Sequence, residues 1–311
     1  MENIYELIKE QEKIFDKEYK EIQEGYKELD IIEKSSVVTL EELVYNNPEK
    51  KKLSVLIEEA EANEISKTNE LINKLKEQMK RVLNWIMSMF KHYDKLFAEG
   101  ANFVKNNDLN AYMNKIKAKR INVTVTCHYQ KPPFQRMQKE CLREINIDRF
   151  VTKRMRGNSN SIGQQANENL ASGDKTENFL NGLVKNYKLD KESLQEVDLT
   201  KINVLVIHND LVTLPEANKK LNNIKSKVQK LYNQAINQVR EDARNTKEKK
   251  AMKADNELAF INSQIKTLNE RIRAYAKIMT MVFKEDYNIA KLIVSKANGG
   301  TTEVKDNEKR K

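Results

Sequence analysis

The most regular hydrophobic pattern in the chain lies at residues 71–97. Its apolar side chains recur at steps of three and four residues, which places them on one face of a helix. They are Leu71, Leu75, Met79, Val82, Ile86, Phe90, Tyr93 and Phe97. The face widens between Leu83 and Phe90, where the only tryptophan, Trp85, is found. We expect other helices, a partner or a lipid interface to cover so broad an apolar face.

Similar patterns predict helices before this stretch. Residues 2–34 carry an apolar stripe with some gaps, and Lys and Glu alternate on the opposite side, where they can pair at i,i+4. The stripe consists of Ile4, Leu7, Ile8, Ile14, Phe15, Ile22, Tyr26 and Leu29. Thr39 and Glu42 form a capping box, which predicts a short helix to about Tyr45.

The helix that contains residues 71–97 is predicted to run from Glu49 to Glu99, because Gly100 is a natural stop. Asp108 is the predicted N-cap of another helix that ends near Lys119. Further helices are predicted at residues 134–156 and 177–187, and Asp190 is predicted to cap the element that follows.

Two short segments instead suggest strands. Residues 121–126 (INVTVT) alternate with a period of two and are rich in β-branched side chains. Pro132 and Pro133 end this region, and residues 202–208 (INVLVIH) are the second candidate. Two strands alone make a poor sheet, so we expect them to pair with each other or with one more short strand.

The C-terminal part is predicted to be helical over residues 215–297, with Pro215 at a first helical position. Two coiled-coil-like seams step through it at three and four residues. The first is Leu221, Ile224, Val228, Leu231 and Ala235; the second is Leu258, Ile261, Ile265, Leu268, Ile272, Tyr275, Met279 and Val282. Residues 243–257 between them are very polar, so the region is either a hairpin or one long helix. We favour the hairpin, because its two seams can bury each other.

Residues 157–176 are polar and contain almost no apolar side chain, which predicts a linker or mobile loop. Together these patterns divide the chain into six predicted segments. They are an acidic helical segment (1–46), the amphipathic core helix with a basic region and short strand (47–156), the linker (157–176), a small α/β segment (177–214), a long helical hairpin (215–297) and a polar tail (298–311).

Composition agrees with a thin core. Hydrophobic residues make up 39% and charged residues 33% of the 311 positions, and only 8 Gly and 4 Pro are available to stop helices. The expected fold is mainly α, with long amphipathic helices in an extended bundle and a small β element. The acidic, amphipathic N-terminus does not resemble a signal peptide, and no run of about 18 apolar residues predicts a transmembrane helix.

Charge is distributed unevenly along the chain. The net charge is +10, but residues 1–60 carry 9 Lys/Arg against 16 Asp/Glu, whereas residues 105–156 carry 13 against 4. This asymmetry suggests a polyanionic partner, pairing between copies, or simply a solvated basic surface. The candidates for non-specific contact with DNA phosphates are Lys115, Lys117, Lys119, Arg120, Arg149, Lys153, Arg154 and Arg156.

The broad face of the central helix supplies a second candidate interface, with a membrane or a partner protein. Its residues are Trp85, Ile86, Met89, Phe90 and Phe97. The same pattern is typical of the core helix of a bundle, which we favour over membrane contact.

Catalytic and metal-binding patterns are not evident in the sequence. The soft ligands Cys127, His128, Cys141 and His208 match none of the zinc spacings. Adjacent Cys127 and His128 on a strand would point to opposite faces, so they cannot act as a nucleophile and its base. Two cysteines are also too few for a disulfide framework. We therefore expect no enzymatic activity, no metal and no cofactor.

The stretch LNWIMSMFKHYDKLFAEGANFVKNNDLNAYMNKI, with INVTVTCHYQ after it and IRAYAKIMTMVFKEDYNIAKLIVSKAN near the end, resembles bacteriophage internal head and other virion structural proteins. In that class a Trp-Ile/aromatic helix leads into a Phe-rich segment, an Asn/Asp break and a short helix with basic residues at its end. A β-branched segment follows, and a long helix rich in Tyr, Met and Ile closes the chain. The resemblance covers residues 70–130 and 258–297, and does not extend to the acidic first 60 residues or to residues 157–176.

This resemblance implies a non-enzymatic virion protein inside the head, made in the bacterial cytoplasm and packaged in many copies. Its partners would be other virion proteins and further copies of itself, with non-specific contact to packaged DNA. Two alternatives remain open from the residues alone. One is a basic helical protein associated with DNA, and the other is an ejected, membrane-active protein that uses residues 71–97.

Overall fold

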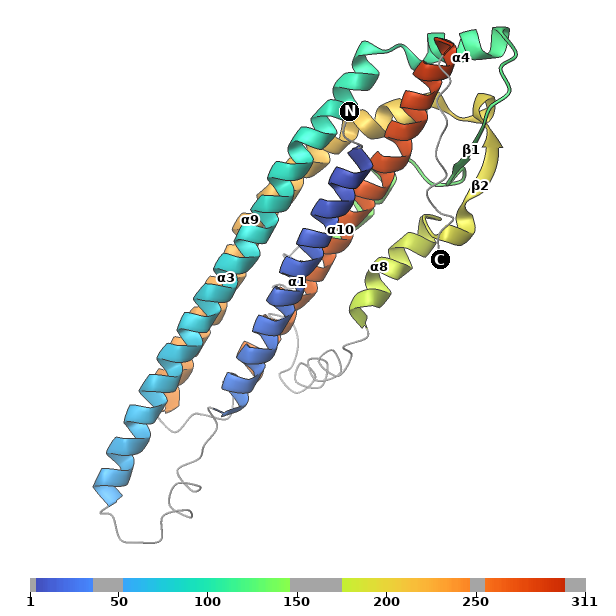
Figure 1. The fold of residues 1–311 in the computed structure, drawn as a ribbon. Coiled ribbons are helices and arrows are strands. Elements are labelled where there is room, and N and C mark those ends of the chain that lie inside the picture. Colours follow the sequence, from blue (N-terminus) through green and yellow to red (C-terminus); the bar gives the residue numbers. More distant parts are fainter. Residues whose placement is uncertain (1–3, 36–52, 146–174, 247–254, 300–311) are drawn as a thin grey trace. The chain divides into compact units, whose positions relative to one another are not determined.

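A computed structural model describes residues 4–35, 53–145, 175–246 and 255–299, and the elements follow one another as drawn in Figure 1. The long helices are α1 (Ile4–Ser35), α3 (Leu53–Asn106), α9 (Val204–Thr246) and α10 (Asp255–Ala297). The shorter elements are α4 (Leu109–Ala118), β1 (Thr124–Cys127), α5 (Phe134–Ile145), α8 (Lys175–Asn186), the 3-10 turns η1 (Lys191–Ser193) and η2 (Leu199–Lys201), and β2 (Gln195–Asp198). The described chain is mainly α with a small antiparallel sheet, which confirms the predicted fold class.

The elements form two compact units, each assembled from separate stretches of the chain. Unit 1 contains α1, α3 up to Ser88, α9 from Asn223 and α10 up to Asn269. Unit 2 contains the other parts of α3, α9 and α10 together with the shorter elements. The end of α9 thus shares a unit with the start of α10, as a helical hairpin requires. The connection at residues 247–254 lies outside the described residues.

Unit 1 is built on the predicted apolar stripe of α1. The stripe residues Ile8, Phe15, Ile22, Tyr26 and Leu29 are all buried, whereas Ile14 is 45% exposed. Trp85 of α3 is only 2% exposed, and its ring centroid lies 5.2 Å from that of Tyr19 on α1. This confirms the expectation that the single tryptophan is shielded by helices.

The predicted stop of α3 at Gly100 is wrong, because the helix continues to Asn106. A Cβ atom at residue 100 would lie 2.6 Å from Cε2 of Phe283 on α10. Gly100 therefore allows α3 and α10 to approach closely, and it does not end a helix. The predicted N-cap Asp108 is confirmed, since its side chain accepts a hydrogen bond from the backbone N–H of Ala111 at 3.0 Å.

The small sheet confirms one predicted strand and corrects the other. β1 pairs antiparallel with β2, with Cys127 opposite Gln195, whereas residues 202–208 enter α9. Asn203 caps this helix, because its Oδ1 atom accepts a hydrogen bond from the backbone N–H of Leu205 at 3.1 Å. The apolar run continues at helical spacing into the core through the buried side chains of Val204, Ile207, Leu211 and Leu214.

The predicted helix start at Pro215 is also wrong. Pro215 lies inside α9. Proline in a helix interior costs roughly 3 kcal/mol, because it removes an N–H donor and its ring crowds the preceding turn. Leu211 and Leu214 are fully buried just before it. Burial of such leucines is worth a few kcal/mol each, of about the same size as the proline penalty, so tertiary packing keeps the helix continuous.

The remaining helix predictions are confirmed where the structure describes them. The helices predicted at residues 177–187 and from residue 134 are α8 and α5. The short helix near Tyr45, residues 157–174 of the predicted loop, and the tail from residue 300 lie outside the described residues.

Candidate functional site

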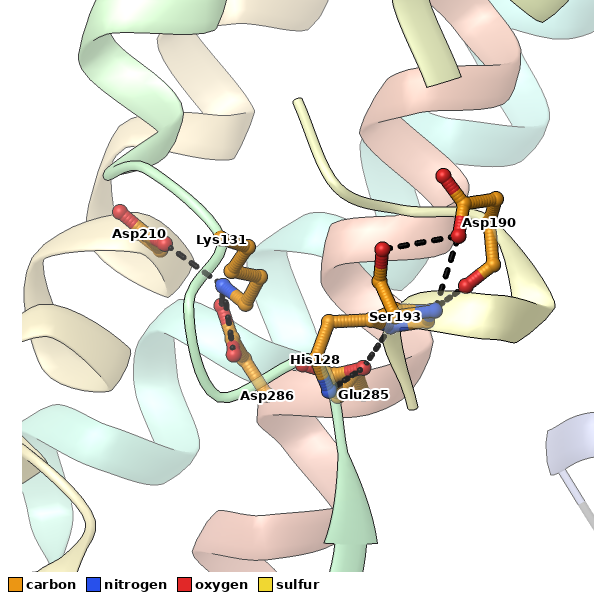
Figure 2. Close-up of polar contacts among 7 residues, drawn as sticks. All are labelled: His128, Lys131, Asp190, Ser193, Asp210, Glu285 and Asp286. Atoms are coloured by element: carbon orange, nitrogen blue, oxygen red, sulfur yellow. Dashed lines mark hydrogen bonds and ion pairs between the residues drawn. The ribbon is translucent and has the colours of Figure 1, made fainter. Parts of the chain in front are cut away.

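A group of buried charged side chains surrounds the loop between β1 and α5 in unit 2 (Figure 2). Lys131 in this loop places its Nζ atom 3.1 Å from Oδ2 of Asp210 on α9 and 3.0 Å from the carboxylate of Asp286 on α10. The three side chains are 7%, 2% and 1% exposed, in that order. We call them the Lys131 cluster. One ammonium group therefore joins the loop to two helices through buried carboxylates.

Asp210 also holds the start of α5. Its Oδ1 atom accepts a hydrogen bond of 2.9 Å from the backbone N–H of Phe134, the first residue of that helix. The two residues before Phe134 are Pro132 and Pro133, which have no N–H to satisfy. A carboxylate is also favoured at the positive end of a helix. Asp210 thus supplies from α9 the capping group that the local sequence lacks.

The electrostatics of the Lys131 cluster are unbalanced, because one lysine faces two carboxylates. Burial raises the pKa of Asp286; Lys131 opposes this rise, while the negative charge of Asp210 adds to it. Burial alone would lower the pKa of Lys131, but Asp286 and Asp210 outweigh it and raise that pKa. The ammonium therefore stays charged, and Asp286 keeps its proton to a higher pH than an ordinary aspartate does.

His128, the residue after β1, uses both of its ring nitrogens. Nδ1 lies 2.5 Å from Oε2 of Glu285 on α10, and Nε2 lies 3.1 Å from the backbone carbonyl oxygen of Asp190. Both partners are hydrogen-bond acceptors, so only the imidazolium, with two N–H groups, satisfies both. Burial alone would lower the pKa of His128, but the hydrogen bond and charge of Glu285 outweigh it and raise the pKa.

Ser193 lies near this histidine, but its hydroxyl group is not placed as a nucleophile. Its Oγ atom and its backbone N–H both donate to Oδ1 of Asp190, each at 2.8 Å. This is the N-cap predicted for Asp190, and the hydrogen bonds from Ser193 lower the pKa of the Asp190 carboxyl. A catalytic serine needs a base that accepts its proton, whereas the ring of His128 faces Glu285 and a carbonyl group.

The two cysteines belong to the core. Cys127 and Cys141 are both buried thiols, and burial raises the pKa of Cys127 to about 11. A thiol with such a pKa is a poor nucleophile and metal ligand at neutral pH. In the part of the chain that the structure describes, no group of three His, Cys, Asp or Glu side chains is arranged to hold a metal ion.

Four of the predicted DNA-contacting residues are exposed at the C-terminal end of α4. They are Lys115, Lys117, Lys119 and Arg120. Arg120 adopts a φ of +51°, and the backbone N–H of Ile121 donates to the carbonyl oxygen of Ile116 at 3.1 Å. This is a Schellman-type helix end, where glycine is usual. The other four candidates, Arg149, Lys153, Arg154 and Arg156, lie outside the described residues.

The five candidates for a membrane or partner interface lie along α3. Phe90 is partly exposed, and the buried ones are Trp85, Ile86, Met89 and Phe97. None of the described helices is both long and apolar enough to cross a membrane. Contact of this face with a lipid interface would require α3 to separate from the side chains that now cover it.

Sequence reasoning missed the Lys131 cluster and Glu285. A signal was present, because Asp286 continues the buried seam of α10 that runs through Met279 and Val282. An acidic residue at a seam position needs a buried partner. Nothing in the local sequence identifies that partner as Lys131, which approaches from a loop 155 residues away in the chain.

Comparisons with protein-family models, with curated proteins and with solved structures found no match to this chain.

Proposed function

We propose that this chain is a non-enzymatic structural protein of a bacteriophage particle, located inside the head. It is assembled in the bacterial cytoplasm with other virion proteins and with further copies of itself. The proposal rests on the resemblance of residues 70–130 and 258–297 to virion structural proteins. These stretches form most of α10 and the continuous run from the middle of α3 through α4 to the loop after β1.

The observation that most favours a structural role is that the buried charged side chains of unit 2 bind one another and nearby backbone groups. Lys131, Asp210 and Asp286 bind one another, and Asp210 also caps α5. His128 binds Glu285 and the carbonyl group of Asp190. Each of these five side chains is therefore engaged in holding a loop, a helix end or a strand end in place. Such an arrangement fixes tertiary structure and leaves these groups little freedom to react.

Mass spectrometry of purified particles tests this proposal. We expect the chain to be present in virions and protected from added protease until the capsid is opened. Digestion in intact particles would place it outside the head, and its absence from particles would reject a virion role. Capsid, portal or tail genes beside its coding sequence would agree with the first outcome.

Non-specific contact with packaged DNA is a second proposed property, favoured by the exposed basic end of α4. Lysine and arginine at a helix C-terminus also stabilise the helix dipole, so their charge alone is not decisive. Arg120 is more informative. A non-glycine residue with φ of +51° is strained, and glycine at this position would relieve that strain. Arginine at this strained position is consistent with a role for its charge.

A salt titration of duplex DNA binding tests this contact on the full chain. We expect affinity to fall with salt with a log–log slope of roughly −0.9 per phosphate contacted, without sequence preference. Replacing Lys115, Lys117, Lys119 and Arg120 with glutamine should reduce that slope. The matched control removes the same charge from exposed residues of α3: Lys76, Lys80, Arg81 and Lys91. Equal losses in both variants would mean that α4 is not the contact surface.

Arg120→Gly separates charge from helix stability. It should stabilise the end of α4 slightly and still weaken DNA binding. Unchanged DNA binding by this variant would show that Arg120 does not contact phosphates.

The acidic residues 1–60 could cover the same basic surface, within one copy or between copies. DNA binding that appears only when these residues are removed would favour pairing between copies. Absence of binding at low salt in both proteins would reject the DNA contact.

A further inference from the structure

The two-stranded ribbon of β1 and β2 is fastened to α10 at one of its ends. Because Cys127 at the end of β1 pairs with Gln195 at the start of β2, residues 128–131 and 190–193 lie at the same end of the strands. We call these two segments the ribbon end. His128 in the first segment binds the backbone of Asp190 in the second, and it also binds Glu285 of α10. A single imidazole ring therefore joins three stretches of the chain.

Two further contacts reach the loop that carries His128. Nζ of Lys188 donates to Oε1 of Gln130 at 2.6 Å, on the exposed side of the loop. On the buried side Lys131 binds Asp210 and Asp286. The side chain of His128 is 14% exposed, so solvent protons can reach the ring without unfolding of the unit.

We propose that His128 is a proton-dependent latch, in which the imidazolium fastens the ribbon end to α10 and loss of its ring proton releases it. A neutral imidazole has one N–H group and one lone pair. Because Nδ1 faces a carboxylate and Nε2 faces a carbonyl oxygen, one acceptor would then face a lone pair. The ion pair with Glu285 would also be lost, which weakens the attachment on both sides of the ring.

The charged groups around His128 determine the direction of the response. Glu285 on α10 and the backbone carbonyl group of Asp190 favour the imidazolium, while burial and Lys131 in the same loop oppose it. Beyond Lys131 lie Asp210 of α9 and Asp286 of α10. The sum favours protonation, so the pKa of His128 in the folded chain lies above its ordinary value. The latch is therefore fully closed below about pH 6.5 and opens as pH rises through the folded-state pKa.

Asp286 gives a pH dependence of the same sign. Because its pKa is raised in the folded chain, its contribution to stability also falls as pH rises. Its contribution must be separated from that of His128. Nuclear magnetic resonance makes this feasible, because the chain has only three histidines: His92, His128 and His208. Their imidazole signals can be assigned by substitution and followed from pH 5 to 9 in the full chain. We expect the His128 signal to titrate above the ordinary value of about 6.5.

Hydrogen exchange measured over the same pH range, expressed as protection factors, tests the release itself. Peptides from residues 124–131 and 190–198 should lose protection over the pH range in which the His128 ring loses its proton. Their protection factors should fall by up to about tenfold for each unit by which the pKa of His128 is raised. Peptides from residues 8–29 of α1, in unit 1, should show no such change.

Three variants complete the test. His128→Gln should abolish this pH dependence while leaving the titration of Asp286. Glu285→Gln should shift the transition to lower pH, and the matched control His208→Gln, also in unit 2, should leave it unchanged. The proposal is overturned if the His128 signal titrates at or below about 6.5. It is also overturned if the ribbon end of the unsubstituted chain keeps constant protection, or if His128→Gln retains the full pH dependence.

Discussion

Unit 1 and unit 2 use different stretches of α3, α9 and α10, and they bury polar groups of different kinds. In unit 1 the hydroxyl oxygens of Tyr26 and Tyr232 lie 3.1 Å apart, and the side-chain amide of Asn269 donates to Tyr26. In unit 2 Lys131 binds two buried aspartates. The first network consists of neutral groups, whereas the second pairs a charged lysine with two acidic side chains.

The difference matters for how each unit responds to its surroundings. Burial raises the pKa of Tyr232 further from neutrality, so the network of unit 1 does not titrate between pH 5 and 9. In unit 2 Asp286 does titrate there, because burial raises its pKa to about 8, and the pKa of His128 is raised from its ordinary value by Glu285. A neutral network holds helices together at a stability that is insensitive to pH, whereas a charged one makes stability depend on protons. Four experiments would sharpen or break this contrast.

The largest effect is expected in unit 1 from Trp85→Ala. The indole ring is 2% exposed and packs beside Tyr19, so its removal should cost about 3–5 kcal/mol. Hydrogen exchange of α1 peptides measures this loss for unit 1 alone. Trp85→Phe is the matched control, because the indole N–H has no hydrogen-bond partner among the described residues. Similar protection in the alanine and phenylalanine variants would contradict the expected packing.

The second effect belongs to unit 2. Lys131→Met leaves Asp210 and Asp286 buried together without a counter-charge, at a cost of about 3 kcal/mol above about pH 8, where Asp286 loses its proton. The cost should shrink as pH falls through the raised pKa of Asp286, because that side chain then takes up a proton. Exchange of peptides from α4 and β1 reports it. Adding Asp286→Asn should restore part of the loss; a double variant no more stable than Lys131→Met would mean that charge is not the cause.

A third comparison uses one glycine from each unit. At Gly100 an added Cβ would meet the ring of fully buried Phe283, and at Gly25 it would meet Gln78, with Oε1 as the nearest atom. The ring cannot move aside, so Gly100→Ala should cost about 2 kcal/mol. Gln78 can turn away, although its hydrogen bond to the carbonyl oxygen of Ile22 would be lost. Gly25→Ala should therefore cost less; equal losses in urea titrations of the two variants would refute this.

The smallest effect is expected from Tyr26→Phe, which removes one hydroxyl from the neutral network. Tyr232 and Asn269 would each lose a partner, at a cost of about 1 kcal/mol. Because no charge is involved, the loss measured by exchange of α1 peptides should be the same at pH 5.5 and pH 8.5. A loss that varies between these pH values would remove the contrast between the two units.

The helices of both units could be predicted because their signal is local. Apolar residues at steps of three and four define α1, α3 and α10, and Asp108 and Asp190 act as caps within the residues that directly follow them. The shielding of Trp85 follows from the same periodicity. The strand predicted at residues 202–208 is wrong, because a short β-branched run fits a buried helix as well as a strand. The capping by Asn203 was the sign that favoured the helix.

The candidate site could be predicted only in part. The acidic side chain of Asp286 interrupts an apolar seam, which indicates that it has a buried partner. The sequence does not identify that partner. Lys131 approaches it from a loop whose position depends on how α5 is capped by Asp210 and how β1 pairs with β2. The proton balance of His128 likewise depends on Glu285, 157 residues further along the chain.

The sequence by itself therefore determined most of the helical elements, their apolar faces and some of their ends, because these depend on residues a few positions apart. Tertiary structure alone decided that Gly100 lies inside a helix, where Phe283 needs the space. It also decided that Pro215 is tolerated beside buried leucines and that one lysine serves two aspartates. These outcomes depend on contacts between residues far apart in the chain, whose energies outweigh local preferences only when the helices are packed.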